Sequence, residues 1–157
     1  MNDYRVRAIL ITRDNSLLLI KRIKQDIKPY WVFPGGGVED SDNNDFKIAL
    51  IRELREELNA QVKKIRKPIY YIKRLKNNKI VQYEIYFLVE VENWSEIDRS
   101  GPEFSDESRG LYLIEEIPFN KNSLTQINIK PDEVKQFLIK NIHNIHSLPE
   151  IDLDLMI

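Results

Sequence analysis

The stretch WVFPGGGVED, residues 31–40, is followed along the chain by RELREEL, residues 52–58. Three of the five glycines of this 157-residue protein stand in the first segment, and three glutamates stand in the second. A glycine run permits positive φ angles and close approach of another part of the chain. The order suggests a rigid glycine turn placed directly ahead of a helix rich in carboxylates.

The segment 45–58 has the apolar spacing of an amphipathic helix. Apolar side chains recur there at intervals of three and four: Ile51, Leu54 and Leu58. Asp45 is a suitable N-cap, because its carboxylate can accept hydrogen bonds from the first free N–H groups. Asn59 stands where a helix often ends in a left-handed residue. We expect the three apolar side chains to face a core.

The carboxylates of this helix lie close together. At about 100° per residue, Glu53, Glu56 and Glu57 span roughly a quarter of the circumference. Like charges at spacings of three and four destabilise a helix, and a divalent cation would offset their repulsion. Mg²⁺ and Mn²⁺ prefer such oxygen ligands. The simpler alternatives are a solvated charged face for the helix and a tight strand-to-helix turn for the glycines.

Together these residues resemble the signature of the Nudix hydrolases, written G-x5-E-x7-R-E-U-x-E-E-x-G-U, where U is a bulky aliphatic residue. GGGVED matches its opening, RELREELNA matches its second half, and the lead-in FPGGGVE is also typical of the family. The resemblance implies hydrolysis of the diphosphate linkage of a nucleoside di- or triphosphate or related derivative, by attack of water on phosphorus. It also implies Mg²⁺ or Mn²⁺ as the cofactor.

The chain departs from the signature in its loop. No glutamate occupies the first acidic position, and the loop EDSDNND carries about two extra residues, so Asp40, Asp42 and Asp45 all remain candidates. The late glycine is Asn59, a residue that adopts the left-handed region readily. The last aliphatic residue is Ala60, smaller than usual. The altered loop motivates an alternative function, a non-catalytic Nudix-like module that binds a nucleotide.

The resemblance also implies roles for individual residues. Glu56 and Glu57 are expected as the principal metal ligands, and Glu53 as a further ligand or the group that activates water. The carbonyl of Gly36 or Gly35 is another candidate ligand, and Gly35 is also a candidate substrate contact. These roles make Glu53 and Glu56 catalytic candidates.

Arg52 completes the catalytic candidates, because the resemblance implies that it orients the carboxylates. A downstream acid often contributes in the family, and three acids of the segment 95–110 are candidates: Glu103, Asp106 and Glu107. Lys21 and Arg22 are candidates for phosphate contact, since they end an expected strand; a solvated strand end is the alternative.

Other side chains have simpler explanations. Four aromatic residues could stack on a base but are more often core residues: Trp31, Phe33, Tyr83 and Tyr86. His143 and His146 lack a third ligand nearby and are expected on the surface.

The remaining pattern predicts alternating strands and helices. Strands are expected at 4–12, 17–22, 31–34, 61–75, 79–92 and 111–114, and a second helix at 131–142. The first two strands should form a hairpin, and the segment 23–30 should be a polar loop. This order predicts one α+β domain over residues 1–157, an α/β/α sandwich with a mixed β-sheet packed between helices.

Composition restricts the partners. The net charge of −1 gives no general attraction to nucleic acid or to an anionic membrane. The absence of cysteine excludes disulfides and thiolate catalysis, and no apolar run approaches the roughly 18 residues of a membrane span. We expect a cytoplasmic protein whose partner is a small nucleotide. The apolar tail 148–157 makes a homodimer plausible.

Overall fold

The computed structural model describes residues 3–94 and 110–156. Its strands are β1 (Asp3–Leu10), β2 (Ser16–Lys24), β3 (Ile27–Val32), β4 (Gly35–Gly37), β5 (Gln61–Lys76), β6 (Lys79–Asn93), β7 (Leu111–Pro118) and β8 (Ile129–Lys130). Its helices are η1 (Asp40–Asp42), α1 (Phe46–Leu58), α3 (Lys121–Thr125), α4 (Asp132–Lys140), η3 (Ile145–Ser147) and α5 (Leu153–Met156). None of the helices in this described part is long and apolar enough to cross a membrane.

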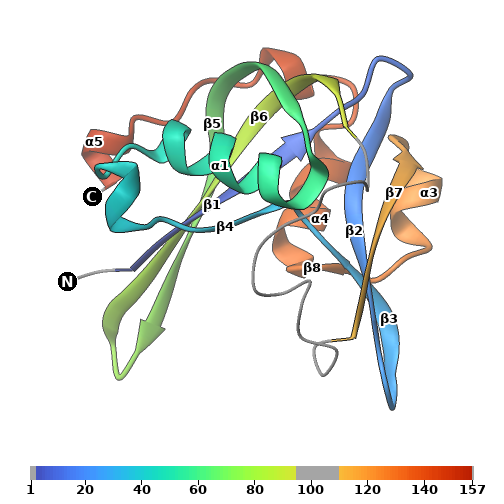
Figure 1. Cartoon of the computed structure of the whole chain (residues 1–157). Helices are drawn as coiled ribbons and strands as arrows, with labels where there is room; N and C mark the ends of the chain where they lie inside the picture. The colour runs from blue at the N-terminus through green and yellow to red at the C-terminus, as the bar shows by residue number, and fades with distance from the viewer. Residues whose placement is uncertain (1–2, 95–109, 157) are drawn as a thin grey trace.

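The strands form two mixed four-stranded sheets (Figure 1). The first sheet has the order β4-β1-β6-β5, in which β1 runs parallel to β6 and antiparallel to β4. The second sheet has the order β7-β2-β3-β8. The expected α+β class is confirmed, with the strands divided between two sheets rather than joined in one.

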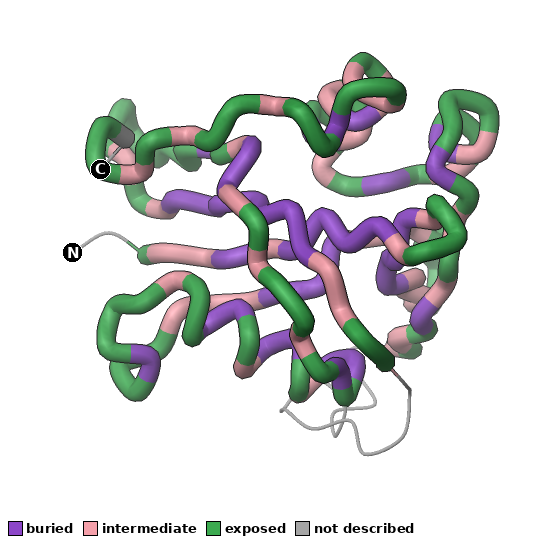
Figure 2. The backbone as a smooth tube through the Cα atoms, turned by 90° about the horizontal axis from the view of Figure 1, so that it is seen from above, coloured by how far each residue is buried: buried purple, intermediate pink, exposed green. Residues whose placement is uncertain are grey.

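Helices cover both faces of the first sheet. One core lies between this sheet and α1, where Leu50, Leu54 and Leu58 meet Phe87. The other lies on the opposite face, where Val134 and Leu138 of α4 pack against a second set of strand residues. Figure 2 shows the buried stretches running through the middle of the molecule, with loops and helix outer faces exposed. Because β1 and β6 are covered on both sides, apolar residues dominate positions 6–10 of β1 and fill positions 85–89 of β6.

Three sequence predictions about the first strands are wrong. β1 and β2 do not form an extended hairpin, since a single bridge between Ile11 and Leu17 joins them before they enter different sheets. The segment 23–30 is not a loop, because most of it continues β2 and begins β3. The glycines form the short strand β4, paired with β1, rather than a tight turn.

The apolar face of α1 also differs from the prediction. Leu54 and Leu58 are buried, but Ile51 is 37% exposed, and Ala49 and Leu50 complete the buried set. The buried face is centred between Glu57 and Leu54, and at about 100° per residue Ile51 lies roughly 90° from that centre. The helix therefore faces the sheet with part of its acidic side.

The local signals around α1 are confirmed. The Asp45 side chain accepts hydrogen bonds from the backbone N–H groups of Lys47 and Ile48 at 2.9 and 3.1 Å. Asn59 ends the helix with a left-handed φ of 45°. Asn43 and Asn44 also have positive φ, at 54° and 59°, so the lengthened loop makes its turn immediately before the N-cap.

The C-terminal segment packs on the body of the protein. The backbone N–H of Ile151 donates to the carbonyl of Pro68 in β5 at 3.0 Å, and the Lys67 ammonium donates to the carbonyl of Leu148. Leu153 is partly buried against the core beneath α1, whereas Leu155 is 85% exposed.

Candidate functional site

The glycine strand β4 is closely packed at two points, once against β1 and once against α1. Gly35 has a φ of +141°, and a Cβ added there would stand 2.0 Å from the carbonyl oxygen of Val6. A Cβ added to Gly36 would stand 2.5 Å from the Cδ and Oε1 atoms of Glu53. The first position needs glycine because of the neighbouring backbone, and the second because of the carboxylate that rests on it.

Two of the three predicted carboxylates are buried. Glu53 is 8% exposed and Glu57 is 6% exposed, while Glu56 is half-exposed at the rim of this group of acids. The backbone N–H of Gly35 donates a hydrogen bond of 2.7 Å to Oε1 of Glu57. Buried carboxylates are retained only where hydrogen bonds or cations stabilise their charge. The burial of Glu53 and Glu57 argues against a merely solvated charged face.

Arg52 joins the acids to the loop. Its Nη1 lies 3.1 Å from Oε1 of Glu53 and 3.4 Å from Oε1 of Glu56. Its Nη2 donates to the carbonyl of Gly37 at 2.9 Å, and its Nε and Nη2 contact both carboxylate oxygens of Asp42 at 3.0 and 2.9 Å. The planar guanidinium suits this arrangement because its donors form a rigid fork. Arg52 thus orients two acids of α1 and the loop together.

Among the three loop acids, Asp42 is the one that contacts Arg52. Asp42 is 2% exposed and also accepts from the backbone N–H of Glu39 at 2.8 Å. Its hydrogen bonds to Arg52 hold the pKa of the Asp42 carboxyl below its usual value, and the same contact raises the pKa of Arg52. Asp45 caps the helix instead, and Asp40 is exposed.

The two cations of β2 lie on opposite faces of their strand, as adjacent strand residues must. Arg22 follows the two-residue period of Leu18, which belongs to the core beneath α1, and its guanidinium lies 3.6 Å from the ring centre of Tyr112. Lys21 lies on the other face, with its ammonium 5.2 Å from the ring centre of Trp31. The two candidates for phosphate contact therefore lie on different faces of β2.

The aromatic residues and histidines named in the sequence analysis divide between the buried cores and the surface. Phe33, Tyr83 and Tyr86 are buried in the cores, at 1%, 5% and 1% exposure, while Trp31 is half-buried and donates its indole N–H to Glu115. Both histidines are exposed, as expected: His143 and His146. The three downstream acids lie outside the described residues: Glu103, Asp106 and Glu107.

A charged cluster that the sequence analysis missed lies beside the glycine strand. Glu84 is 4% exposed, and it accepts from Arg7 at 3.4 Å, from Arg74 at 3.3 Å and from the Tyr86 hydroxyl at 2.5 Å. Burial alone would raise the pKa of Glu84, but Arg7, Tyr86 and Arg74 together hold it below its usual value. Burial and the charge of Glu84 raise the pKa of Tyr86. A cation within the apolar run of β1 is the signal that could have identified this cluster.

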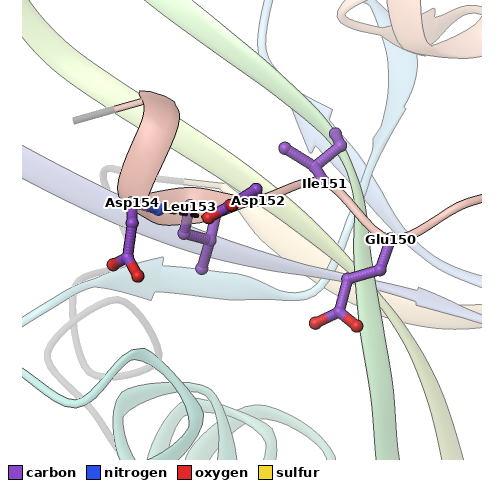
Figure 3. Close-up of a pocket in the computed structure, with 5 residues that line it drawn as sticks. All are labelled: Glu150, Ile151, Asp152, Leu153 and Asp154. Atoms are coloured by element: carbon purple, nitrogen blue, oxygen red, sulfur yellow. Dashed lines mark hydrogen bonds between the residues drawn. The ribbon is translucent and has the colours of Figure 1, made fainter.

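Surface recesses do not coincide with the acids of α1. One of about 420 Å³ is bordered by the C-terminal residues Glu150–Asp154. Figure 3 shows the carboxylates of Glu150 and Asp154 at opposite ends of this segment, on the exposed tail rather than in an enclosed site. A larger recess, of about 740 Å³, lies at the turn between β1 and β2. The acids of α1 line neither recess.

The donor set fits a hard divalent cation in its chemistry. Within residues 3–94 and 110–156, no three acidic or histidine side chains form a ready-made metal cage. Mg²⁺ does not require one, because it is usually held by one or two carboxylates together with waters and substrate phosphates. Glu53, Glu56 and Glu57 provide such oxygens, and the lack of a side chain on Gly36 leaves the space that the Glu53 carboxylate occupies. These residues would hold the ion.

Comparison with known proteins identifies the family. The model of the NUDIX domain matches residues 1–136, and no curated protein matches the sequence significantly. A Nudix hydrolase from Nitrosomonas europaea has a TM-score of 0.63 at 20% identity, over 97% of this chain and 77% of that one. MutT from Burkholderia pseudomallei has 0.61 at 18%, over 89% and 97%.

A third solved structure is a bifunctional NMN adenylyltransferase/ADP ribose pyrophosphatase from Francisella tularensis. It has a TM-score of 0.58 at 16% identity, over 90% of this chain and 42% of that one. At these identities the structures establish the fold, and the family match establishes the relationship. The expectation of a Nudix-type pyrophosphohydrolase is confirmed at the level of family and fold. The chain belongs to the Nudix domain family.

Proposed function

We propose that this protein hydrolyses the diphosphate linkage of a nucleoside diphosphate or triphosphate derivative, with Mg²⁺ or Mn²⁺ as its cofactor. The observation that carries the proposal is the position of Glu53 and Glu57, buried against Gly35 and Gly36, neither of which has room for a side chain. Glu53 and Glu56 share the guanidinium of Arg52, whereas Glu57 accepts from the backbone N–H of Gly35. A divalent cation would offset the negative charge that one arginine leaves, and it would also coordinate the phosphates of a substrate.

Arg52 and the three glutamates of α1 have distinct roles in this proposal. Glu56 and Glu57 are the principal ligands, and the bond from Gly35 fixes the orientation of Glu57. Arg52 fixes the Glu53 carboxylate, which accepts the proton of the attacking water or serves as a further ligand. When bound, the ion polarises the phosphoryl oxygens and lowers the pKa of coordinated water. Phosphoryl transfer depends mainly on such positioning and charge neutralisation.

The substrate enters from the side of the rim carboxylate. Arg22 is the phosphate contact that we favour, because it shares the α1 side of β2 and its guanidinium is already oriented by Tyr112. Lys21 and Gly35 remain candidates for substrate contact, Lys21 from the opposite face of β2. The structural relatives include an ADP ribose pyrophosphatase and a UDP-X diphosphatase, which makes nucleotide sugars suitable members of a substrate panel. A cytoplasmic location agrees with the lack of cysteine.

Hydrolysis is tested by measuring release of phosphate or nucleoside monophosphate from a panel of nucleoside triphosphates, ADP-ribose and UDP-sugars, with and without Mg²⁺ or Mn²⁺. Glu56→Gln and Glu57→Gln together should lower kcat/KM by at least about 100-fold, or about 2.7 kcal/mol of transition-state stabilisation. Glu150→Gln, an exposed acid of the C-terminal tail, is the matched control and should retain activity.

Two outcomes would contradict the proposal. Unchanged activity in the Glu56→Gln, Glu57→Gln variant would refute the assigned ligands. Thermal stabilisation by nucleotides without turnover, with or without metal, would instead support the non-catalytic nucleotide-binding module.

A further inference from the structure

One arginine of β1 holds the glycine strand by hydrogen bonds from the side opposite α1. Arg7 pairs with Gly35 in the register of β1 and β4, and with Tyr86 in the register of β1 and β6. Its guanidinium Nη1 donates to the carbonyl of Phe33 at 3.3 Å and to the carbonyl of Gly35 at 3.1 Å. Its Nε faces Glu84 at 3.4 Å. One side chain thus spans three strands of the molecule.

These bonds enclose the peptide that orients Glu57. The carbonyl of Pro34 accepts from the backbone N–H of Ala8 at 2.8 Å, and the N–H of the same peptide, that of Gly35, donates to Glu57. Arg7 holds the carbonyls immediately before and after this peptide. With its neighbours fixed, the direction of the Gly35 N–H is fixed as well.

The strand needs this support because its own sequence provides little. β4 consists of three glycines, which lose the most backbone entropy on ordering and pack no side chain. Its backbone at Gly35 has a φ of +141°. Besides its ladder bonds to β1, the segment and the residues just before it gain two hydrogen bonds from Nη1 of Arg7, and the rigid guanidinium is held in place by the contact of its Nε with Glu84.

We propose that Arg7 is a positioning residue that acts through the Gly35 peptide to hold Glu57 in the orientation needed to bind the ion. The connection runs from Glu84, through Arg7 and Gly35, to Glu57, and so links the two faces of the first sheet. The part that concerns the ion rests on the proposed function, whereas the part that concerns the Gly35 N–H does not.

Variants at Arg7 separate this role from a general contribution to folding. Arg7→Met removes all three contacts, and Arg7→Lys keeps the charge without the fork. Glu84 retains Arg74 and Tyr86 in both variants, so the buried carboxylate is not left without a partner. Arg5→Met is the matched control: it removes a cation two residues away in the same strand, whose side chain makes no hydrogen bond or ion pair within the described residues.

Two measurements on the full chain test the proposal. Amide hydrogen exchange by NMR should be at least about tenfold faster at Gly35 in Arg7→Met than in the wild type, with Arg7→Lys between them. Mn²⁺ affinity, measured from free Mn²⁺ by electron paramagnetic resonance without substrate, should fall by about tenfold, the size typical of lost support to a ligand. Arg5→Met should match the wild type in both.

The outcomes distinguish the two proposals. Wild-type protection of Gly35 together with unchanged Mn²⁺ affinity in folded Arg7→Met would overturn the role of Arg7. If Arg7→Met does not fold, Arg7→Lys decides, with exchange at Gly35 compared with exchange at the β1–β6 ladder in the same sample. If the wild type binds no Mn²⁺, the proposed function fails, and the exchange rate at Gly35 still decides whether Arg7 orients this peptide.

Discussion

Gly36 lies directly against the carboxylate of Glu53, at a distance that leaves no room for even one carbon atom. A Cβ there would stand 2.5 Å from Oε1 and 2.7 Å from Oε2 of Glu53. The atoms that must give way belong to the end of a flexible side chain rather than to the backbone. The contact therefore bears on the position of Glu53 more than on the stability of the fold.

Gly36→Ala should lower activity with little loss of stability. We expect the methyl group to displace the Glu53 carboxylate and to reduce kcat/KM at least tenfold, while the midpoint of thermal unfolding changes by only a few degrees. Gly37→Ala is the control, since no atom of the described residues beyond its chain neighbours lies within 4 Å of its added Cβ, and it should keep at least half of the activity. Equal activity of the two variants would contradict this role for Gly36.

Gly35→Ala, in contrast, should lower the stability of the fold. Its φ of +141° disfavours any L side chain, and its Cβ would meet the carbonyl oxygen of Val6 at 2.0 Å and the Cα of Arg7 at 2.8 Å. Because these are backbone atoms, strain and overpacking should reduce the free energy of unfolding by about 2–4 kcal/mol. Urea denaturation followed by circular dichroism measures this difference, and a loss smaller than that of Gly36→Ala would be inconsistent with the geometry.

Asp42 should make the stability of the protein depend on pH in the acid range. Its pKa is lower in the folded chain than its ordinary value of 3.8, so the unfolded chain binds more protons there. The contribution of Asp42 is thus complete above that ordinary pKa and is lost as the pH falls through the folded value. Asp42→Asn should lower the free energy of unfolding at pH 7 by about 1–3 kcal/mol.

The same variant should show a shallower decline of stability below pH 4. Urea denaturation at pH 7 and at several values between pH 3 and 5 measures both effects. Asp40→Asn, at an exposed position of the same loop, is the control. A decline parallel to that of the wild type in Asp42→Asn would show that another group carries the acid sensitivity.

Asp45→Ala should weaken the start of α1 without altering the acids. The loss of two hydrogen bonds to backbone N–H groups should cost about 1 kcal/mol of stability. Because the carboxylates begin two helical turns further along, we expect kcat/KM to remain within about threefold of the wild type when assayed well below the unfolding midpoint. A loss of activity as large as that of Gly36→Ala would show that the cap also positions the site.

The sequence predicts what depends on neighbours along the chain. Asp45 and Asn59 were identified as the ends of α1 because capping involves only the adjacent turn. The predicted burial of Ile51 was wrong because burial depends on which side of the helix meets the sheet. The side that meets it includes Glu53 and Glu57. The pattern of acids was visible, whereas their burial was not.

Pairing between distant strands could not be predicted from local patterns. β1 and β2 have the composition of a hairpin, yet each finds better partners elsewhere, since both have apolar residues on two faces. Asp42 could not be distinguished from the other loop acids by counting, because the choice depends on which one reaches Arg52 across the turn. Arg7 was missed for the same reason, since its contacts lie on two other strands.

The central place of β1 in the first sheet has a consequence for how the site assembles during synthesis. β1 leaves the ribosome before the other strands of this sheet, but its parallel neighbour β6 ends only at Asn93. Glu53 and Glu57 are therefore synthesised well before the first sheet, which supports the glycine strand β4 beneath them, is complete. Parallel pairing of remote segments is slow to form. The nascent chain thus carries a cluster of acids without its structural support until β6 has been translated.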